Sequence, residues 1–244
     1  AQGEACVEVK ACFSLRGGFN GGTLASALNM LDSGQSRALA DPWLLNPALV
    51  RPPTVPLDDD PVAPHRDADF KAWVGPFFMG PVNTRVVRRS AALLGYGPDF
   101  HYQEYLRFGS GALAAATAVG VSAGMNASQA ALRLAPVRAL ARRLAPAPGQ
   151  GPSEASMNRG SFRCELVGHG AGGTVARAKV AASGDPGNRA TTVMVCEAAL
   201  ALAKDAGLLP DGQRAGGVLT PASGLGVLLE KRLRAAGMTV KVQA

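Results

Sequence analysis

Reactive and metal-binding side chains are sparse in this chain, and their shortage excludes several classes of protein. Only four of the 244 residues are cysteines, at positions 6, 12, 164 and 196. They form no CxxC pair, and no histidine lies at the spacing of a zinc ligand, so neither a disulfide scaffold nor a zinc site is predicted. The sequence signatures of nucleophilic and zinc-dependent hydrolases are missing as well. We therefore expect free thiols, an intracellular protein and no bound metal.

Aromatic and charged residues are also few, at 5% and 18% of the chain. The formal net charge is nevertheless +7, which could suit nucleic acid, anionic lipid or a phosphorylated cofactor. The basic residues form no long run and are not interleaved with aromatic residues, so nucleic acid is not expected as a partner. No signal-peptide pattern is present at the start of the chain.

Hydrophobic residues make up 47% of the sequence, and 30 glycines and 17 prolines punctuate it. Alternating apolar residues predict strands over 6–15, 99–108, 161–169, 174–182 and 238–242. Apolar residues at helical spacing predict a helix with Thr23 as its N-cap, and further helices over 83–94, 189–206 and 225–236. The predicted fold class is α+β over 1–244, with a mixed β-sheet and helices packed mainly on one face.

Two segments interrupt this pattern. Prolines crowd between residues 41 and 64, which predicts an extended surface loop. The acidic triplet Asp58–Asp60 in this loop is expected to be solvated, with a metal site as the alternative. The second segment, 109–145, is predicted to be a helical insertion. It has no charged residue before Arg133, but Ala and Gly dominate there, so a helix on protein or at a lipid interface is favoured over a membrane span.

The end of the insertion is amphipathic and basic. Val137 and Leu140 fall on one side of the predicted turns, whereas Arg138 and Arg142 fall opposite and Arg143 flanks them. This pattern fits a solvated helix face, and it also fits a helix on a membrane surface. The candidate membrane-contacting residues are Leu113, Val137, Arg138, Leu140, Arg142 and Arg143.

Two glycine-rich segments are similar to nucleotide-binding loops. Residues 168–173 match GxGxxG, but an alternating segment follows instead of a helix, so a hairpin loop is predicted. Residues 16–23 do lead into a helix, whose N-terminus could hold an anion, but they lack the lysine of a P-loop. The residues alone therefore predict an α+β domain without a self-sufficient active site.

The order of several short motifs is more specific than any one of them. They are RGGFNGGTLAS at 16–26, GPFFM at 75–79, NTRVVRRS at 83–90, LGYG at 94–97, GDPG at 184–187, EAAL at 197–200 and GGVLTPA at 216–222. This ordered set resembles the saccharopine dehydrogenase-like oxidoreductases, and within them the trans-acting enoyl reductases and their eukaryotic relatives. The resemblance covers nearly the whole chain. Arg189 departs from it, because relatives often have an aromatic residue near that turn.

The resemblance implies an activity and a domain arrangement. Family members have an N-terminal Rossmann domain for NAD(P)H and a second domain for substrate binding and dimerisation, and this chain matches the second domain. It implies an oxidoreductase that acts on an acyl or lipid-like substrate. The NAD(P)H would be bound mainly by the N-terminal domain, which is absent from this chain, and the chain alone would be inactive. The implied partners are that Rossmann domain or a protein supplying it, a second copy in a homodimer, and a lipid surface.

The resemblance also suggests where a cleft would lie. The start of the helix after residue 20 would face the interdomain cleft, and no catalytic residue is assigned. The cleft candidates are Gly21, Gly22, Thr23 and Ser26, with Arg88 and Arg89 as anion partners. A tight turn and a solvated helix face are the alternative. The alternative function is a non-catalytic interaction or structural subunit, attached to a membrane or lipid-droplet surface or lying in the cytoplasm.

Overall fold

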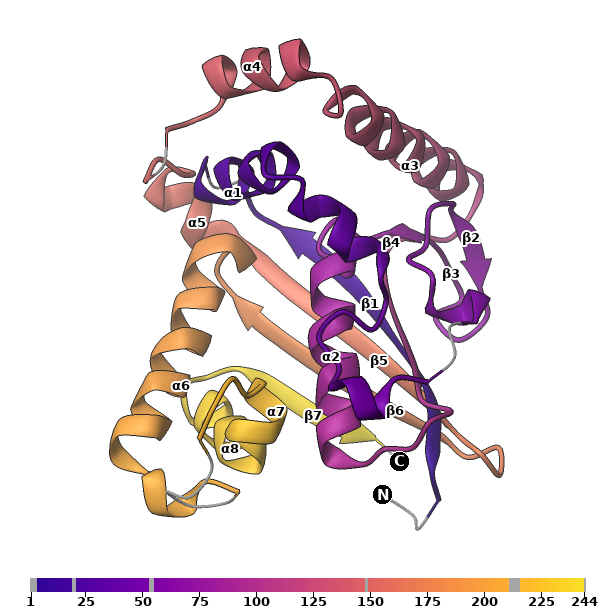
Figure 1. Cartoon of the computed structure of the whole chain (residues 1–244), viewed down its shortest axis with the longest axis vertical. Coiled ribbons are helices and arrows are strands. Elements are labelled where there is room, and N and C mark those ends of the chain that lie inside the picture. The colour runs from indigo at the N-terminus through magenta and orange to yellow at the C-terminus, as the bar shows by residue number, and fades with distance from the viewer. Residues whose placement is uncertain (1–3, 19–20, 53–54, 148, 211–215, 244) are drawn as a thin grey trace.

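A seven-stranded mixed sheet forms the centre of the molecule (Figure 1). The structure is a computed structural model, and it describes every residue except 1–3, 19–20, 53–54, 148, 211–215 and 244. The strand order is β2-β3-β4-β1-β5-β6-β7. The bounds are β1 Cys6–Arg16, β2 His65–Asp67, β3 Ala72–Pro76, β4 His101–Gly109, β5 Ser161–Gly170, β6 Val175–Ser183 and β7 Thr239–Gln243. Among the strands of the described residues, only β1 and β4 pair in parallel, so the α+β class and the mixed sheet are confirmed.

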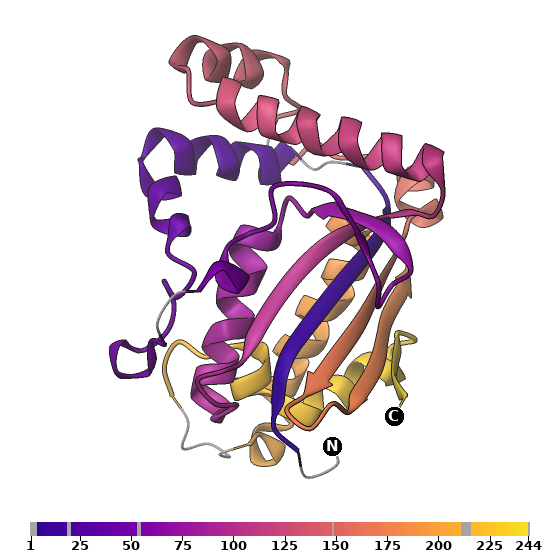
Figure 2. The ribbon, with the colours of Figure 1, turned by 90° about the vertical axis from the view of Figure 1, so that its right-hand side faces the viewer.

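The helices lie mainly against one face of this sheet. α2 (Gly80–Leu94) lies beside β4, while α6 (Thr191–Lys204), α7 (Pro221–Gly224) and α8 (Gly226–Ala235) lie beside the β5–β7 half (Figures 1 and 2). Because successive side chains of a strand point to opposite faces, only alternate residues meet these helices. Ala11, Tyr102 and Cys164 do so and pack with Ala91 of α2. The predicted one-sided arrangement of helices is therefore confirmed.

The opposite face of the sheet is covered only in part, by the turn between β2 and β3. Phe70 of this turn packs on Cys12 and Val167. Asp69 accepts hydrogen bonds from Lys10 Nζ (2.8 Å) and lies 3.0 Å from His169 Nε2, which ties the turn to β1 and β5. Burial alone would raise the pKa of Asp69, but the hydrogen bonds with Lys10 and His169 outweigh it and lower the pKa. The β2–β3 hairpin was not predicted, because β2 has only three residues.

The insertion forms two helices above the sheet, next to α1 (Gly21–Asp32) (Figure 1). These are α3 (Ala112–Ala131) and α4 (Ala135–Leu144), followed by the short α5 (Glu154–Arg159). α3 buries its small residues Ala114, Ala118 and Ser122, and a Cβ on Gly75 of β3 would lie 2.8 Å from Ser122 Oγ. Small side chains therefore bring α3 close to the sheet. Among the described helices, none combines the length and apolarity that crossing a bilayer requires.

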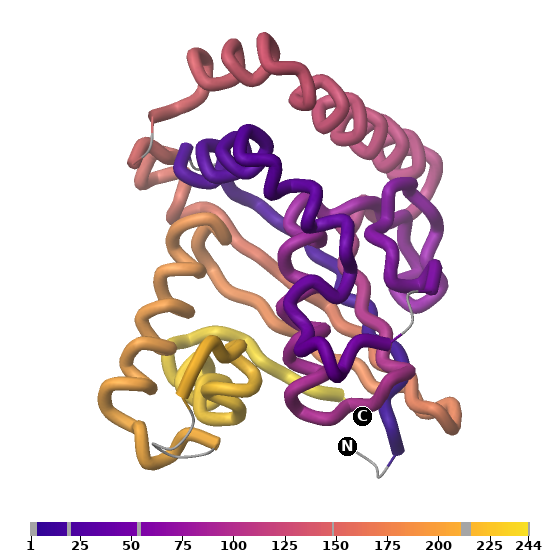
Figure 3. The backbone as a smooth tube through the Cα atoms, in the orientation of Figure 1, coloured from indigo at the N-terminus to yellow at the C-terminus, as the bar shows by residue number. Residues whose placement is uncertain are grey.

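The Pro-rich segment is irregular, as predicted, but its acidic triplet is not solvated as a whole. Figure 3 shows the backbone descending from α1 beside α2 before it reaches β2. Short 3-10 turns lie at 35–40, 48–50 and 56–58. Asp58 is fully buried, accepts a hydrogen bond from the Val55 amide (3.1 Å) and lies 2.9 Å from His101 Nδ1. The predicted solvated triplet is therefore wrong for Asp58, because the loop folds onto β4.

Other local predictions can be compared with the structure. Residues 168–170 end β5 and residues 171–174 turn the chain into β6, so the predicted hairpin is confirmed. α2 ends at Gly95, whose φ of 69° favours glycine, as predicted. Thr23 is the third residue of α1 and not its N-cap, because the helix begins at Gly21.

Candidate functional site

Arg88 of α2 holds the Pro-rich loop against the sheet. Its side chain is 1% exposed, and its guanidinium donates hydrogen bonds to three backbone carbonyls, those of Pro42 (3.2 Å), Asp58 (2.9 Å) and Tyr102 (3.0 Å). It also lies over the Trp43 ring, 5.3 Å from its centroid. Burial lowers the pKa of Arg88, and the nearby Asp58 carboxylate opposes that effect. Removing a guanidinium from water costs free energy, and these hydrogen bonds offset that cost. Arg88 therefore stabilises the loop only when all of its partners are in place.

The two neighbouring arginines reinforce the same contact. Arg85 is 2% exposed, pairs with Asp60 (2.5 Å) and bonds the carbonyl of Leu39. Arg89 donates to the carbonyls of Leu45 and Val218, the second at 2.9 Å. All three arginines of α2 thus bind segments that lie far from it in the sequence.

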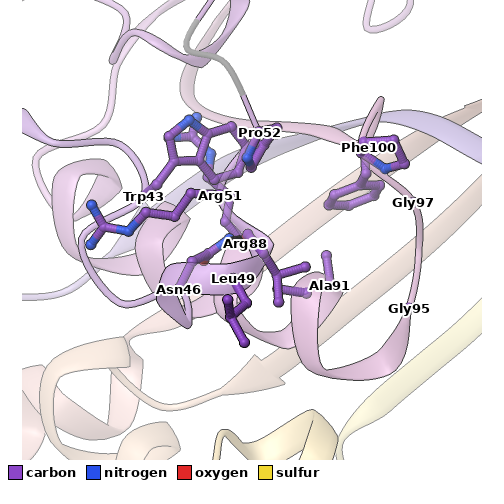
Figure 4. A pocket seen from close by; sticks show the side chains of 13 residues that line it. Trp43, Asn46, Leu49, Arg51, Pro52, Arg88, Ala91, Gly95, Gly97 and Phe100 are labelled. Carbon is purple, nitrogen blue, oxygen red and sulfur yellow. Dashed lines mark hydrogen bonds between the residues drawn. The ribbon is translucent and has the colours of Figure 1, made fainter.

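A pocket of about 440 Å³ lies between the Pro-rich loop and the C-terminal half of α2 (Figure 4). Small-molecule sites commonly have volumes of roughly 300–1,000 Å³. Most of its lining is apolar: Leu49, Val50 and Pro52 come from the loop, and Ala91, Ala92 and Phe100 come from α2 and the approach to β4. Such a lining suits an aliphatic ligand better than a strongly hydrated one.

Buried polar groups belong to the residues of this pocket. Trp43 Nε1, Asn46 Oδ1 and Arg88 Nε have no hydrogen-bond partner within the described part of the chain. Trp43 and Asn46 are 5% and 7% exposed, and both line the pocket. Unpaired donors and acceptors of this kind cost free energy in the folded protein. They distinguish the pocket from an ordinary surface depression.

The first turn of α1 contains the cleft candidates Gly21, Gly22, Thr23 and Ser26. Gly21 is buried and its amide donates to the carbonyl of Gln150 (3.1 Å). A Cβ at Gly21 would lie 2.4 Å from the carbonyl oxygen of Pro146, so only glycine fits there. Thr23 and Ser26 are exposed, and their spacing places them on one side of the helix.

The structure does not join this turn to the predicted anion partners. The hydrogen-bond partners of Arg88 and Arg89 come from the Pro-rich loop, β4 and Val218, and none comes from α1. The assignment of these six residues to a substrate or cofactor cleft stays a prediction.

The glycine loops of the described chain do not fit a nicotinamide dinucleotide as a principal site. The start of α1 is closed by the backbone carbonyls of Pro146, Ala147 and Gln150, and carbonyl oxygens would repel a pyrophosphate. The GxGxxG segment is a hairpin loop without a following helix. Over the residues that the structure covers, no group of three or more His, Cys, Asp or Glu is arranged to hold a metal, and the four cysteines are free thiols.

The membrane-contacting candidates divide into two groups. Leu113 and Leu140 are 82% and 56% exposed, Val137 is half-buried and Arg143 is exposed. Arg138 Nε instead donates to Asp32 of α1 (2.6 Å), and Arg142 pairs with the same carboxylate. The expectation of a solvated arginine face is therefore wrong for Arg138, because it faces α1 while Leu140 faces solvent.

A buried carboxyl group was missed by the sequence analysis. Glu104 of β4 is 3% exposed and accepts hydrogen bonds from Tyr102 Oη (2.8 Å) and Asn83 Nδ2 (2.9 Å). Burial raises the pKa of Glu104 to about 7, although both hydrogen bonds oppose the increase. The sequence did contain a sign of this burial. Alternate residues of a strand share a face, and Glu104 alternates with the apolar Phe100 and Tyr102.

Comparison with known proteins identifies the relatives of this chain. A protein of Mycobacterium tuberculosis named "Putative trans-acting enoyl reductase" is 40% identical over 245 aligned positions, which cover 93% of this chain. A trans-acting enoyl reductase of Mycobacterium ulcerans is 38% identical over 174 positions and 69% of the chain. Over the part that it spans, the chain belongs to the trans-acting enoyl reductase family. No family model and no solved structure matches the chain.

The chain spans only about half of the length of these relatives. The aligned region is 57% of the Mycobacterium tuberculosis protein and 40% of the Mycobacterium ulcerans protein. The names of these relatives assign a trans-acting enoyl reductase activity to those longer proteins. The activity of a whole protein that contains this chain is a matter for proposal.

Proposed function

We propose that this chain is the substrate-binding and dimerisation part of an NAD(P)H-dependent enoyl reductase. The observation that carries the proposal is the 40% identity to a relative with that name over 93% of the chain. In such a reaction the nicotinamide supplies a hydride to the unsaturated acyl group. The glycine loops described above do not fit the dinucleotide, so NAD(P)H is bound mainly by a further domain, and this chain alone is inactive.

In this proposal, the acyl chain of the substrate occupies the pocket beside α2. The apolar side chains of Leu49, Val50 and Phe100 would contact the acyl chain, and burial of apolar surface would supply binding free energy. The cleft candidates Thr23 and Ser26 present hydroxyl groups on the exposed side of α1 and would contact polar parts of the substrate. Arg88 acts as a positioning residue, because its guanidinium fixes the loop that forms one side of the pocket.

The test measures NADPH oxidation by the full-length natural protein with an enoyl thioester such as crotonyl-N-acetylcysteamine and its longer-chain homologues. Ala92→Phe should fill the pocket, which Ala92 lines, and raise KM for long acyl chains about tenfold, as expected when roughly 1.4 kcal/mol of binding is lost. Ala123→Phe on the exposed side of α3 is the matched control. Failure to oxidise NADPH with every enoyl thioester would contradict the proposal.

A second function is favoured by the exposed apolar side chains of α3 and α4. Leu113, Leu140 and Leu144 are 82%, 56% and 76% exposed, and exposed Arg143 lies next to Leu144 at the end of α4. Leucines flanked by arginines suit an anionic lipid surface. The chain would then serve as a non-catalytic interaction or structural module on a membrane or lipid droplet.

Flotation with vesicles that contain anionic lipid tests this alternative. Leu140→Glu with Leu144→Glu should abolish flotation, whereas Leu202→Glu, which changes an equally exposed leucine of α6, should not. Equal flotation of both variants would exclude this surface. The predicted homodimer is tested on the same samples by light scattering after gel filtration.

A further inference from the structure

The uncovered face of the sheet carries an excess of positive charge over β5, β6 and β7. We call Arg163, Arg177, Lys179 and Lys241 the basic face. Strand alternation and the registers place them on one side: Glu165 lies opposite Lys179, Lys179 lies opposite Lys241, and Val167 lies opposite Arg177. The helices α6 and α8 pack on the other side (Figure 2), where Phe162 and Val180 contact Met238 and neighbouring residues.

The charges of the basic face are not balanced from within. Among the described outward residues of β5–β7, Glu165 is the single carboxylate, and it already pairs with Arg107 (3.1 Å) and Arg163 (3.6 Å). Arg177 donates a hydrogen bond to the carbonyl oxygen of Asp69 (3.1 Å), at the border of the face. Across the part of the chain that is described, Lys179 and Lys241 form no ion pair or side-chain hydrogen bond. They lie directly opposite each other on β6 and β7. Like charges at such a position destabilise a sheet, so a partner of opposite charge would relieve the repulsion.

The residues of the basic face favour one kind of binding partner over the others. A symmetric dimer places the same patch on both subunits, so a second copy would set cations against cations. Among the described outward neighbours of these four residues, Ala181 and Thr239 are small or polar, and Val175 is an exposed apolar residue (44%). One exposed valine is too little apolar surface to enter a bilayer. No aromatic side chain is available on it for stacking on bases. A folded protein with an acidic surface fits the flat, positively charged sheet best.

We propose that the basic face docks an acidic protein that carries the acyl substrate as a thioester. This inference rests on the proposed function, since the relatives are named for an enoyl reductase that acts in trans. Charge complementarity would increase the association rate and select the carrier. The acyl group would occupy the pocket beside α2, whose residues Ala91 and Phe100 pack on the helix-covered face of the sheet. The docking surface and the acyl pocket are thus separate sites.

Binding of an acidic acyl carrier protein, labelled for fluorescence anisotropy, to the full-length natural protein tests the proposal. Lys179→Glu with Lys241→Glu should raise Kd about tenfold, and Lys179→Gln with Lys241→Gln should raise it less, because charge reversal adds repulsion to the lost attraction. The control Lys204→Glu with Lys231→Glu makes the same charge change on exposed residues of α6 and α8 and should leave Kd unchanged. Added salt should weaken binding of the unmodified protein.

Kinetics separate docking from catalysis. Lys179→Glu with Lys241→Glu should raise KM for a crotonyl group on the carrier about tenfold. The same variant should leave kcat and the KM for crotonyl-N-acetylcysteamine unchanged. The proposal would be overturned if KM rose equally for both substrates or if Kd for the carrier did not change. It would also be overturned if the basic face bound duplex DNA or anionic vesicles in place of the carrier. If no enoyl thioester is reduced but the carrier binds as expected, the proposed function fails and the docking surface stands.

Discussion

Replacing Glu104 by glutamine should stabilise the protein above neutral pH and have little effect below pH 5. The ordinary pKa of this carboxyl is 4.5, and burial raises it to about 7 in the folded protein. The folded state therefore holds the proton more strongly than the unfolded chain does. By linkage, the free energy of unfolding falls as pH rises from about 4.5 to about 7, by roughly 3 kcal/mol in all. Glutamine does not ionise, so this loss disappears.

The hydrogen bonds of residue 104 determine how much the free energy of unfolding increases in Glu104→Gln. Glutamine Oε1 can still accept from Tyr102, whereas its amide group faces Asn83 Nδ2, which donates in the unmodified protein. Rotation of the Asn83 amide would supply an acceptor, and some of the gain would be lost if it does not rotate. We expect a net stabilisation of about 1–3 kcal/mol at pH 8.5.

Urea unfolding of both proteins at pH 5 and at pH 8.5 measures this difference. Other titrating groups are common to the two proteins and cancel in the comparison. Glu154→Gln, which changes a carboxyl that is 77% exposed, should show no such pH dependence. A Glu104→Gln protein whose stability relative to the parent is the same at both pH values would refute the reasoning.

Three further substitutions test the packing. Gly160→Ala should lower stability by about 1–3 kcal/mol, measured as a fall in Tm, because its Cβ would lie 2.4 Å from the backbone of Asp185. Asp185→Ala should cost about 1–3 kcal/mol in urea unfolding, because this fully buried carboxylate accepts from Arg189 N (3.1 Å) and Asn188 Nδ2 (3.0 Å). Arg88→Met should cost about 3–5 kcal/mol and expose the Pro-rich loop to limited proteolysis, because three carbonyls lose their donor. Unchanged unfolding in any of the three would contradict the contacts named for it.

The candidate site could be predicted only in part. Motif order directed attention to Arg88, which lines the pocket, and to Arg89, which bonds the carbonyl of Leu45 in the Pro-rich loop. Their role as anion partners stays a prediction. The pairing of Arg88 with carbonyls of the Pro-rich loop could not be predicted, since the loop has no periodicity that fixes its path. The same limit explains why Asp58 was expected in solvent although it lies buried beside His101.

The sequence alone determined the elements whose signal is local. Alternation specified β1 and the β5–β6 hairpin, and glycine ended α2, because side-chain period and backbone freedom depend on neighbours in the chain. Only the tertiary structure decided how the other strands pair and which face of the sheet stays uncovered. The three-residue β2 exists because β3 pairs with it, and Lys179 meets Lys241 because β7 returns beside β6. The +7 charge is visible in composition, but strand register concentrates part of it on one face.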